Sequence, residues 1–365
     1  MLDDGVDVSG LAAYNMVGRT IKYKWEVKEL LKKRPEDSGS YFSVPYLVEK
    51  DGVKYFMKAF DFGRFLSMAR PNLDGTERPI SDVLTEMLEA YRYEKDLSLH
   101  CQNSYVTKVS FVVDFSEEYL EGYSLGYVPC LIFEAADGDV RKALNASARL
   151  DDAWKFKSLH DIAVGLKQLH AIDVSHQDLK PSNILVYNKE QESKLCDLGR
   201  SVCHSIKGPY SQMKFTGDRT YAPPEIWYGY FDQDWHKRSF AIDCYMLGNL
   251  IVFYFTHTTM STLMTKYIPS SFRPGEWRGK YEEIVPYLSK AFSDSLNAFE
   301  GSIEDSFFEK NLKELVRYLC EPILDNRGHP SNFKRGVDPY NMQRFISELD
   351  LLRYRAEIRV KKELL

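Results

Sequence analysis

The stretch HQDLKPSN, residues 176–183, decides how this chain is interpreted, together with CDLG, residues 196–199. Phosphoryl transfer from a nucleotide requires a carboxylate that orients a hydroxyl and takes its proton, and a cation beside the moving phosphate. It also requires an amide and a second carboxylate, because magnesium prefers hard oxygen ligands. The two stretches supply these groups in that order, as Asp178, Lys180, Asn183 and Asp197.

Further landmarks follow the same order along the chain as in one large enzyme family. They are the strand-like VKYFMK of residues 53–58, which ends in Lys58, then PPE at residues 223–225, Asp243 at the start of an apolar helical stretch, and Arg327. The whole set covers roughly residues 40 to 345 and resembles the eukaryotic-type Ser/Thr protein kinases. The segment 217–225 and the sparse motifs of the small lobe resemble bacterial members of that family more than animal ones, so we expect a bacterial member.

This resemblance implies an α+β, bilobal protein-kinase-like fold. We expect an N-terminal extension over residues 1–22 and a small β-rich N-lobe with one main helix over 23–136. A larger, mainly α-helical C-lobe should follow over 137–365, with an insertion around 256–302. The resemblance also implies ATP and Mg²⁺ as cofactors and an unidentified protein as the phosphate acceptor.

The resemblance assigns a role to each residue of the two stretches. Asp178 is the base, Lys180 contacts the γ-phosphate, and Asn183 and Asp197 hold Mg²⁺. Lys180 in this loop also implies serine or threonine acceptors.

Two further expectations concern contacts that support the large lobe. Asp243 should anchor the backbone of the loop 176–183. Glu225 and Arg327 resemble the buried ion pair that ties the activation segment to the large lobe.

Nucleotide binding in the N-lobe is predicted from fewer signals. Lys58 should hold the α- and β-phosphates and pair with a glutamate, for which Glu94 fits the family interval better than Glu86 or Glu89. Further positions expected to contact the nucleotide are Gly39, the single glycine left in the phosphate loop, and Val44, Phe133, Glu134 and Ala136.

Four positions depart from the family pattern. Gln177 replaces an arginine that normally receives an activation-segment phosphate, and a neutral amide lacks the charge for this contact. Phe56 replaces a small alanine that lies over the adenine, and its ring either narrows the pocket or stacks on the base. Leu198 and Asp218 stand where a phenylalanine and a threonine are usual.

Composition restricts the other possibilities. The chain has 365 residues, 44% of them hydrophobic, which is ample for a buried core. Its net charge of −5 gives no support to nucleic-acid binding. The six cysteines are scattered without a C-x-x-C pair, and the start of the chain lacks the features of a signal peptide. The most apolar stretch, residues 247–255, is too short to span a membrane. We therefore expect a cytoplasmic protein.

Local patterns predict several elements. Residues 25–33 suit a strand or a helix, and 46–48 and 54–60 form a hairpin around Asp51-Gly52. We expect an inserted loop over 61–79, a helix over 80–100 capped by Ser81 or Asp82, strands over 107–115 and 127–133, and a helix over 154–170.

Two other functions share parts of this pattern. A pseudokinase that binds partners without catalysis is favoured by the sparse phosphate loop, Phe56 and Gln177. A small-molecule kinase of the aminoglycoside-phosphotransferase type also uses an H-x-D…N loop, but Lys180 and the segment 223–225 resemble the architecture that binds protein substrates.

Overall fold

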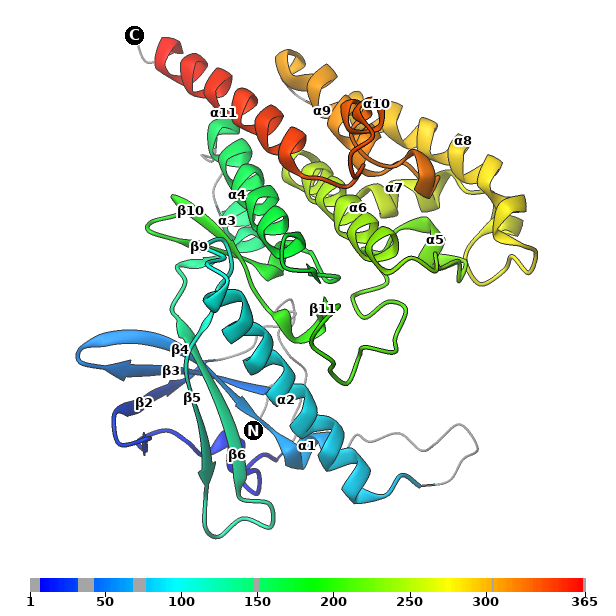
Figure 1. Ribbon diagram of the computed structural model, residues 1–365. Coiled ribbons are helices and arrows are strands. Elements are labelled where there is room, and N and C mark those ends of the chain that lie inside the picture. Colours follow the sequence, from blue (N-terminus) through cyan, green and yellow to red (C-terminus); the bar gives the residue numbers. More distant parts are fainter. Residues whose placement is uncertain (1–6, 32–42, 68–76, 147–150, 304, 364–365) are drawn as a thin grey trace. The chain divides into compact units, whose positions relative to one another are not determined.

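The computed structural model describes residues 7–31, 43–67, 77–146, 151–303 and 305–363 of the chain. Contacts within the chain divide it into two compact units (Figure 1). The small unit comprises residues 1–105, 110–136 and 207–209, and the large unit comprises residues 106–109, 137–206 and 210–365. The first unit is built on a β-sheet and the second is mainly helical, which is the predicted bilobal α+β fold.

The small unit contains a six-stranded antiparallel sheet with the order β1-β2-β3-β4-β6-β5. Asp51 and Gly52 join β3 and β4, and both have positive φ angles, of 52° and 76°, as a tight hairpin turn requires. The predicted hairpin is therefore confirmed, and residues 25–30 form a strand. The strands are β1 (Thr20–Ile21), β2 (Trp25–Leu30), β3 (Ser43–Lys50), β4 (Val53–Phe60), β5 (Val112–Tyr119) and β6 (Tyr127–Glu134).

Two apolar clusters cover the two faces of this sheet, because successive side chains of a strand point to opposite sides. One cluster includes Tyr46, Met57 and Ile132, and residues 12–21, which the sequence assigned to an N-terminal extension, pack into it. The other cluster contains Phe60, Tyr91 and Leu131. Helix α2 (Ile80–Asn103) contributes Tyr91 and so covers the second face.

Two helices of the small unit differ in detail from the sequence prediction. Helix α1 (Phe62–Ser67) occupies the beginning of the expected loop over 61–79. Helix α2 (Ile80–Asn103) forms where predicted, but neither Ser81 nor Asp82 caps it. The N-cap residue is Pro79, whose side chain cannot accept a hydrogen bond from the first turn.

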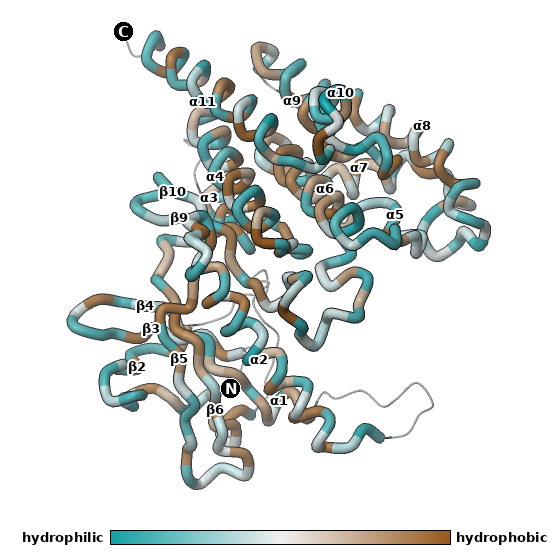
Figure 2. Tube along the Cα trace, viewed as in Figure 1, coloured by the Kyte–Doolittle hydropathy of each residue, from teal (hydrophilic) through white to brown (hydrophobic). Residues whose placement is uncertain are grey.

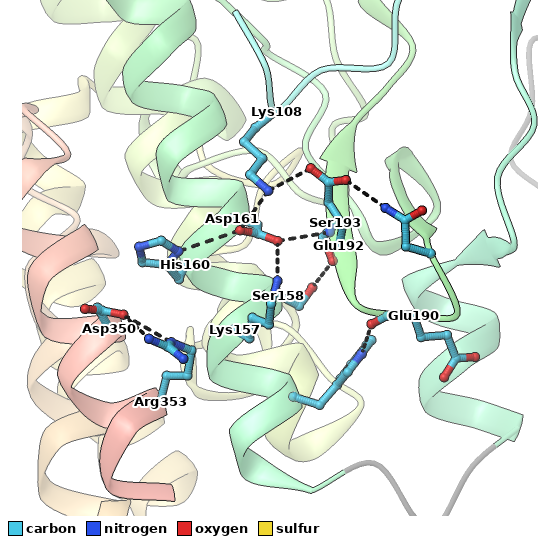
Figure 3. A network of polar contacts seen from close by, with 12 residues as sticks. Lys108, Lys157, Ser158, His160, Asp161, Glu190, Glu192, Ser193, Asp350 and Arg353 are labelled. Atoms are coloured by element: carbon cyan, nitrogen blue, oxygen red, sulfur yellow. Dashed lines mark hydrogen bonds and ion pairs between the residues drawn. The ribbon is translucent and has the colours of Figure 1, made fainter. Parts of the chain in front are cut away.

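The strand predicted over 107–115 begins later, at Val112, because the preceding residues are bound to the large unit to which they belong. The backbone amides of Thr107 and Lys108 both donate to Oε1 of Gln168, at 3.0 and 3.1 Å. The ammonium of Lys108 lies 3.1 Å from Asp161 and 2.9 Å from Glu192 (Figure 3).

Asp161 is the centre of this polar network. Its side chain is 6% exposed and also lies 3.1 Å from Lys157, while its Oδ2 accepts from the Ser193 amide. Burial by itself would raise the pKa of Asp161, but the contacts with His160, the Ser193 amide and the two lysines lower it to about 2.

The large unit is mainly helical, and long helices make up most of it (Figure 1). Helix α4 begins where Asp151 accepts a hydrogen bond from the Trp154 amide, so the predicted helix over 154–170 is confirmed. The helices are α3 (Val140–Ala146), α4 (Asp152–His170), α5 (Pro224–Trp227), α6 (Trp235–Thr256), α7 (Met260–Tyr267), α8 (Tyr281–Glu300), α9 (Ser306–Leu319), α10 (Pro330–Arg335) and α11 (Gln343–Glu363). Helix α11 packs along α4.

Short strand pairs support the loops of this unit. Strands β7, β9 and β10 form one small sheet, and β8 pairs with β11. Their bounds are β7 (Gly138–Asp139), β8 (Val174–Ser175), β9 (Ile184–Tyr187), β10 (Glu192–Leu195) and β11 (Val202–Cys203).

Helix α6 forms the core of the large unit and carries mostly apolar residues (Figure 2). It is longer than the apolar stretch noted in the sequence, and by length and composition alone its 22 residues could cross a membrane. However, 83% of its most apolar window is buried inside the unit, which is typical of a core helix.

Candidate active site

In the small unit, the structure brings Lys58 of β4 and Glu94 of α2 together. The ammonium of Lys58 lies 2.7 Å from Oε1 of Glu94, and their side chains are 12% and 8% exposed. Among the glutamates considered from the sequence, Glu86 instead lies 2.7 Å from Arg78. A nearly buried lysine held by a carboxylate is oriented before any ligand arrives.

The sheet register determines which residues share a face with Lys58. Phe56, two residues earlier, pairs with Phe133, and Lys58 lies 5.5 Å from the centroid of the Phe133 ring. Phe133, predicted near the nucleotide, is therefore on the same face as Lys58. The rings of Phe56 and Phe133 are 6.3 Å apart, so the large side chain of Phe56 packs against its neighbour.

Val44 does not lie on this face, so the structure does not bring it together with Lys58 as the sequence predicted. It pairs with Ala59 and is buried in the cluster on the opposite side of the sheet. In an antiparallel pair, residues opposite one another point to the same side, and a shift of one residue reverses the face. Pro45, which pairs with Lys58, and Leu47, which pairs with Phe56, occupy the face where Val44 was expected.

The remaining predicted positions of the small unit give less information. Gly39 lies outside the residues that the structure describes. Glu134 is the exposed last residue of β6, and Ala136 is half-buried two residues later, where the small unit ends.

In the large unit, the carboxylate of Asp178 is fixed by three donors. Its Oδ1 accepts a hydrogen bond from the Asp218 amide at 2.8 Å. Its Oδ2 accepts one from Nδ2 of Asn183 at 3.0 Å and lies 3.0 Å from the ammonium of Lys180. Two predicted residues of the loop 176–183, Lys180 and Asn183, thus converge on the carboxylate of a third, Asp178, which is 5% exposed.

Asn183 also lies next to the segment that carries Asp197. The amide of Cys196 donates to the Asn183 carbonyl at 3.0 Å, and Asp197 follows in a left-handed conformation with a φ angle of 64°. Nδ2 of Asn183 donates to Asp178, and within the described residues no donor contacts its Oδ1. One amide oxygen and one carboxylate are hard ligands of the kind Mg²⁺ binds, so the donor set fits this ion.

Asp243 of α6 holds the backbone of the loop 176–183, as predicted. Its two oxygens accept hydrogen bonds from the amides of His176 and Gln177, both at 2.9 Å. Nε2 of His170 also lies 2.9 Å from Oδ2 of Asp243, a contact that was not predicted. The sequence feature that could have indicated this contact is the histidine at the end of the helix that leads into the loop 176–183.

Gln177 does not face the segment 197–225 with its side chain. Its amide nitrogen, Nε2, donates to Oγ of Ser175 at 2.8 Å and to the Ser239 carbonyl at 3.3 Å, and the residue is 2% exposed. Gly217 lies against the backbone of Gln177, because a Cβ at this glycine would lie 1.9 Å from the Gln177 carbonyl oxygen. This close approach allows the Asp218 amide to reach Asp178.

Asp218 contacts Asp178 through its backbone and not through its side chain. The carboxylate of Asp218 instead accepts hydrogen bonds from the amide and the hydroxyl of Thr220, at 2.9 and 2.7 Å. The segment 197–225 thus contacts the carboxylate of Asp178 through the backbone amide of Asp218.

The predicted ion pair between Glu225 and Arg327 is confirmed. The guanidinium donates two parallel hydrogen bonds to the carboxylate, at 2.7 and 2.8 Å, and the two side chains are 4% and 0% exposed. Arg327 also donates to the carbonyls of Glu321 and Ala241. Burial opposes its charge, but Glu225 raises the pKa of Arg327 above the ordinary value.

Comparison with known proteins agrees with this geometry. A family model described as "Protein kinase domain" matches residues 82–327. Extracellular signal-regulated kinase 1 of Dictyostelium discoideum is 26% identical over 200 residues, which are 55% of this chain and 32% of the relative. Mitogen-activated protein kinase 13 of Arabidopsis thaliana is 26% identical over 151 residues, or 41% of the chain and 39% of the relative.

A third relative is similar over a shorter stretch. Mitogen-activated protein kinase 4 of Oryza sativa subsp. japonica is 32% identical over 96 residues, which are 26% of each protein. The matched part of the chain therefore spans about a quarter to two fifths of the length of these relatives.

Proposed function

The chain belongs to the protein kinase family, and we propose that it transfers the γ-phosphate of ATP to a serine or threonine hydroxyl of a protein substrate. The observation that carries this proposal is the carboxylate of Asp178, held by Asn183, Lys180 and the Asp218 amide. A general base must be fixed within reach of the proton that it accepts, and these contacts provide that orientation.

The proposed reaction is an in-line displacement at phosphorus. The acceptor hydroxyl gives its proton to Asp178, its oxygen bonds to the γ-phosphorus, and the bond to the β–γ bridging oxygen breaks, so that ADP leaves. Lys180 lies 3.0 Å from Asp178 and carries the charge that would stabilise the transferring phosphate.

Mg²⁺ would be held by Oδ1 of Asn183 and the carboxylate of Asp197. Bound there, the ion would neutralise charge on the ATP phosphates. The hydrogen bonds that Nδ2 of Asn183 donates to Asp178 turn its oxygen away from the base. One amide would thus serve both the carboxylate and the metal.

Nucleotide binding in the small unit is proposed to rest on Lys58 and Glu94. The ion pair holds Lys58 on the face that also carries Phe56 and Phe133. We assign the α- and β-phosphates to Lys58, and the adenine to the backbone of residues 134–136. Gly39 belongs to the proposed phosphate loop.

The partners and location are proposals of the same kind. ATP and a protein acceptor are the proposed partners, and neither nucleic acid nor a membrane is needed for the reaction. All six cysteines are free thiols, which suits the reducing cytoplasm that we propose as the location.

A pseudokinase is the second candidate, and the position of Phe56 favours it. Its ring stands on the face of Lys58 and 6.3 Å from Phe133, where a smaller residue would leave more room for an adenine. In this alternative, the fold binds a partner and transfers no phosphate.

Two substitutions test the proposed roles separately. Asp178→Ala should lower kcat by orders of magnitude and leave the affinity for Mg-ATP nearly unchanged, because the base acts on the acceptor. Asp197→Ala should weaken Mg-dependent ATP binding in calorimetry. Equal kcat in Asp178→Ala and the parent would remove Asp178 from the mechanism. Absence of phosphotransfer by the folded parent protein, with or without ATP binding, would favour the pseudokinase or nucleotide-binding scaffold.

A further inference from the structure

A groove in the large unit lies beside the segment that contacts Asp178. It has a volume of about 590 Å³, within the range of ligand-binding pockets. The loop of residues 274–275 closes one side of it. Its other lining residues are Arg219, Thr220, Trp227, Ser261, Thr262 and Thr265. Arg219, Thr220, Thr262 and Thr265 are exposed, so a second molecule can reach the groove from solvent.

The groove begins close to the proposed base. Arg219 directly follows Asp218, whose amide donates to Oδ1 of Asp178 at 2.8 Å. Consecutive Cα atoms are about 3.8 Å apart, so Arg219 lies next to the residue whose amide contacts the Asp178 carboxylate. A polypeptide whose hydroxyl reaches Asp178 would therefore place a neighbouring residue near this groove.

The walls of the groove are held together by buried polar contacts. Nδ2 of Asn249 donates to the Tyr221 carbonyl and to Oγ of Ser261, both at 2.9 Å. The Ser261 hydroxyl donates to the Ala222 carbonyl at 3.2 Å. These contacts tie α7 to the segment that contains Arg219, so the groove is formed before a ligand binds.

Arg219 gives the groove a positive charge. Its guanidinium donates to the Ile226 carbonyl at 3.0 Å, which holds the side chain in place and leaves other N–H groups available. Among the residues that the structure describes, no carboxylate forms an ion pair with Arg219, and the nearby carboxylate of Asp218 is bonded to Thr220. Thr262 and Thr265 of α7 also line the groove, and their hydroxyls are hydrogen-bonded to Oγ1 of Thr259 and to the Thr262 carbonyl.

We propose that this groove binds an acidic side chain of the protein substrate, a few residues from the serine or threonine that accepts the phosphate. A guanidinium matches a carboxylate through paired hydrogen bonds. Trp227 and the loop 274–275 provide apolar surface for the methylene groups of a glutamate. The proposal rests on the proposed function, since it specifies the substrate of the same site.

Paired peptides test this specificity. Each has one serine or threonine acceptor, and the flanking residues are glutamates in one peptide and glutamines in the other. Because a hydrogen bond to a charged group is worth roughly tenfold or more in affinity, we expect kcat/KM to favour the glutamate peptide about tenfold or more. Arg219→Gln should reduce this preference to within about twofold, and Arg219→Lys should keep part of it.

A matched control and a binding measurement complete the experiment. Arg278→Gln removes another exposed arginine that does not line the groove, and it should leave the preference unchanged. The melting temperature of each variant identifies any that is unfolded. Affinity of the labelled peptides is measured by fluorescence anisotropy for the parent protein and for Arg219→Gln, which requires no catalysis.

The outcomes separate the two proposals. Equal kcat/KM and equal affinity for both peptides would overturn the acidic-residue proposal while leaving phosphotransfer established. A preference that survives in folded Arg219→Gln, or disappears equally in Arg278→Gln, would also overturn it. Preferential binding of the glutamate peptide without any phosphotransfer would support the groove and overturn the proposed function.

Discussion

Removal of Arg327 should destabilise the large unit strongly. The side chain is 0% exposed and its guanidinium contacts both oxygens of Glu225 and two backbone carbonyls. In Arg327→Ala, the carboxylate of Glu225 would remain buried without its countercharge. Breaking a buried ion pair in this way costs about 3–5 kcal/mol.

This free energy translates into a measurable change in melting temperature. For a unit of this size, each kcal/mol shifts the melting temperature by about 2–4 °C, so Arg327→Ala should lower it by about 6–20 °C. The double variant Arg327→Met/Glu225→Leu should recover part of the loss, because it removes both charges and refills the space.

Calorimetric unfolding of purified variants provides the assay. Arg353→Ala is the control, because Arg353 pairs with Asp350 and Glu357 at 29% exposure, where ion pairs contribute about 1 kcal/mol or less. If Arg327→Ala and Arg353→Ala lowered the melting temperature equally, or the double variant lost as much as the sum of its single changes, the buried pair would not have the assigned role.

Three other contacts give predictions that can be measured separately. Because the pKa of Asp161 is lowered to about 2, its charged form contributes about 2 kcal/mol to the free energy of unfolding above pH 4, and this contribution is lost as the pH falls towards 2. In urea unfolding, Asp161→Asn should therefore be less stable than the parent at pH 7 and approach its stability at pH 2. Gly217→Ala should lower kcat at least about tenfold, because it displaces the Asp218 amide from Asp178. Gly138→Ala is the control, because a Cβ there meets nothing within 4 Å. Equal kcat values for the two variants would contradict the role of the close approach at Gly217. Phosphatase treatment should change activity by less than about tenfold, because the side chain of Gln177 is bound to Ser175 and Ser239 and has no charge to receive a phosphate; near-complete loss would indicate another basic site.

The stretch 176–183 could be interpreted from the sequence because its groups are close together along the chain. Asp178, Lys180 and Asn183 lie within six residues, so their convergence needs little knowledge of the rest of the fold. The contact between Glu225 and Arg327, 102 residues apart, was predicted from the family resemblance, since nothing local in the sequence joins them.

The differences between the sequence predictions and the structure concern features that depend on distant partners. The face on which Val44 lies is set by the register of β3 against β4, and a shift of one residue reverses it. The start of β5 is delayed because Lys108 and its neighbours bind α4 and β10, which are far away in the sequence. The groove at Arg219 needs α7 beside the segment 219–227, which no sequence pattern indicates.

Transfer of labelled γ-phosphate from ATP to a protein acceptor, followed by identification of the phosphorylated amino acid, tests the central claim most directly. With Mg²⁺ present, the purified protein should produce phosphoserine or phosphothreonine, and Asp178→Ala should reduce this product by orders of magnitude. No transfer by the parent protein, label only on a small molecule, or equal transfer by Asp178→Ala would contradict the account.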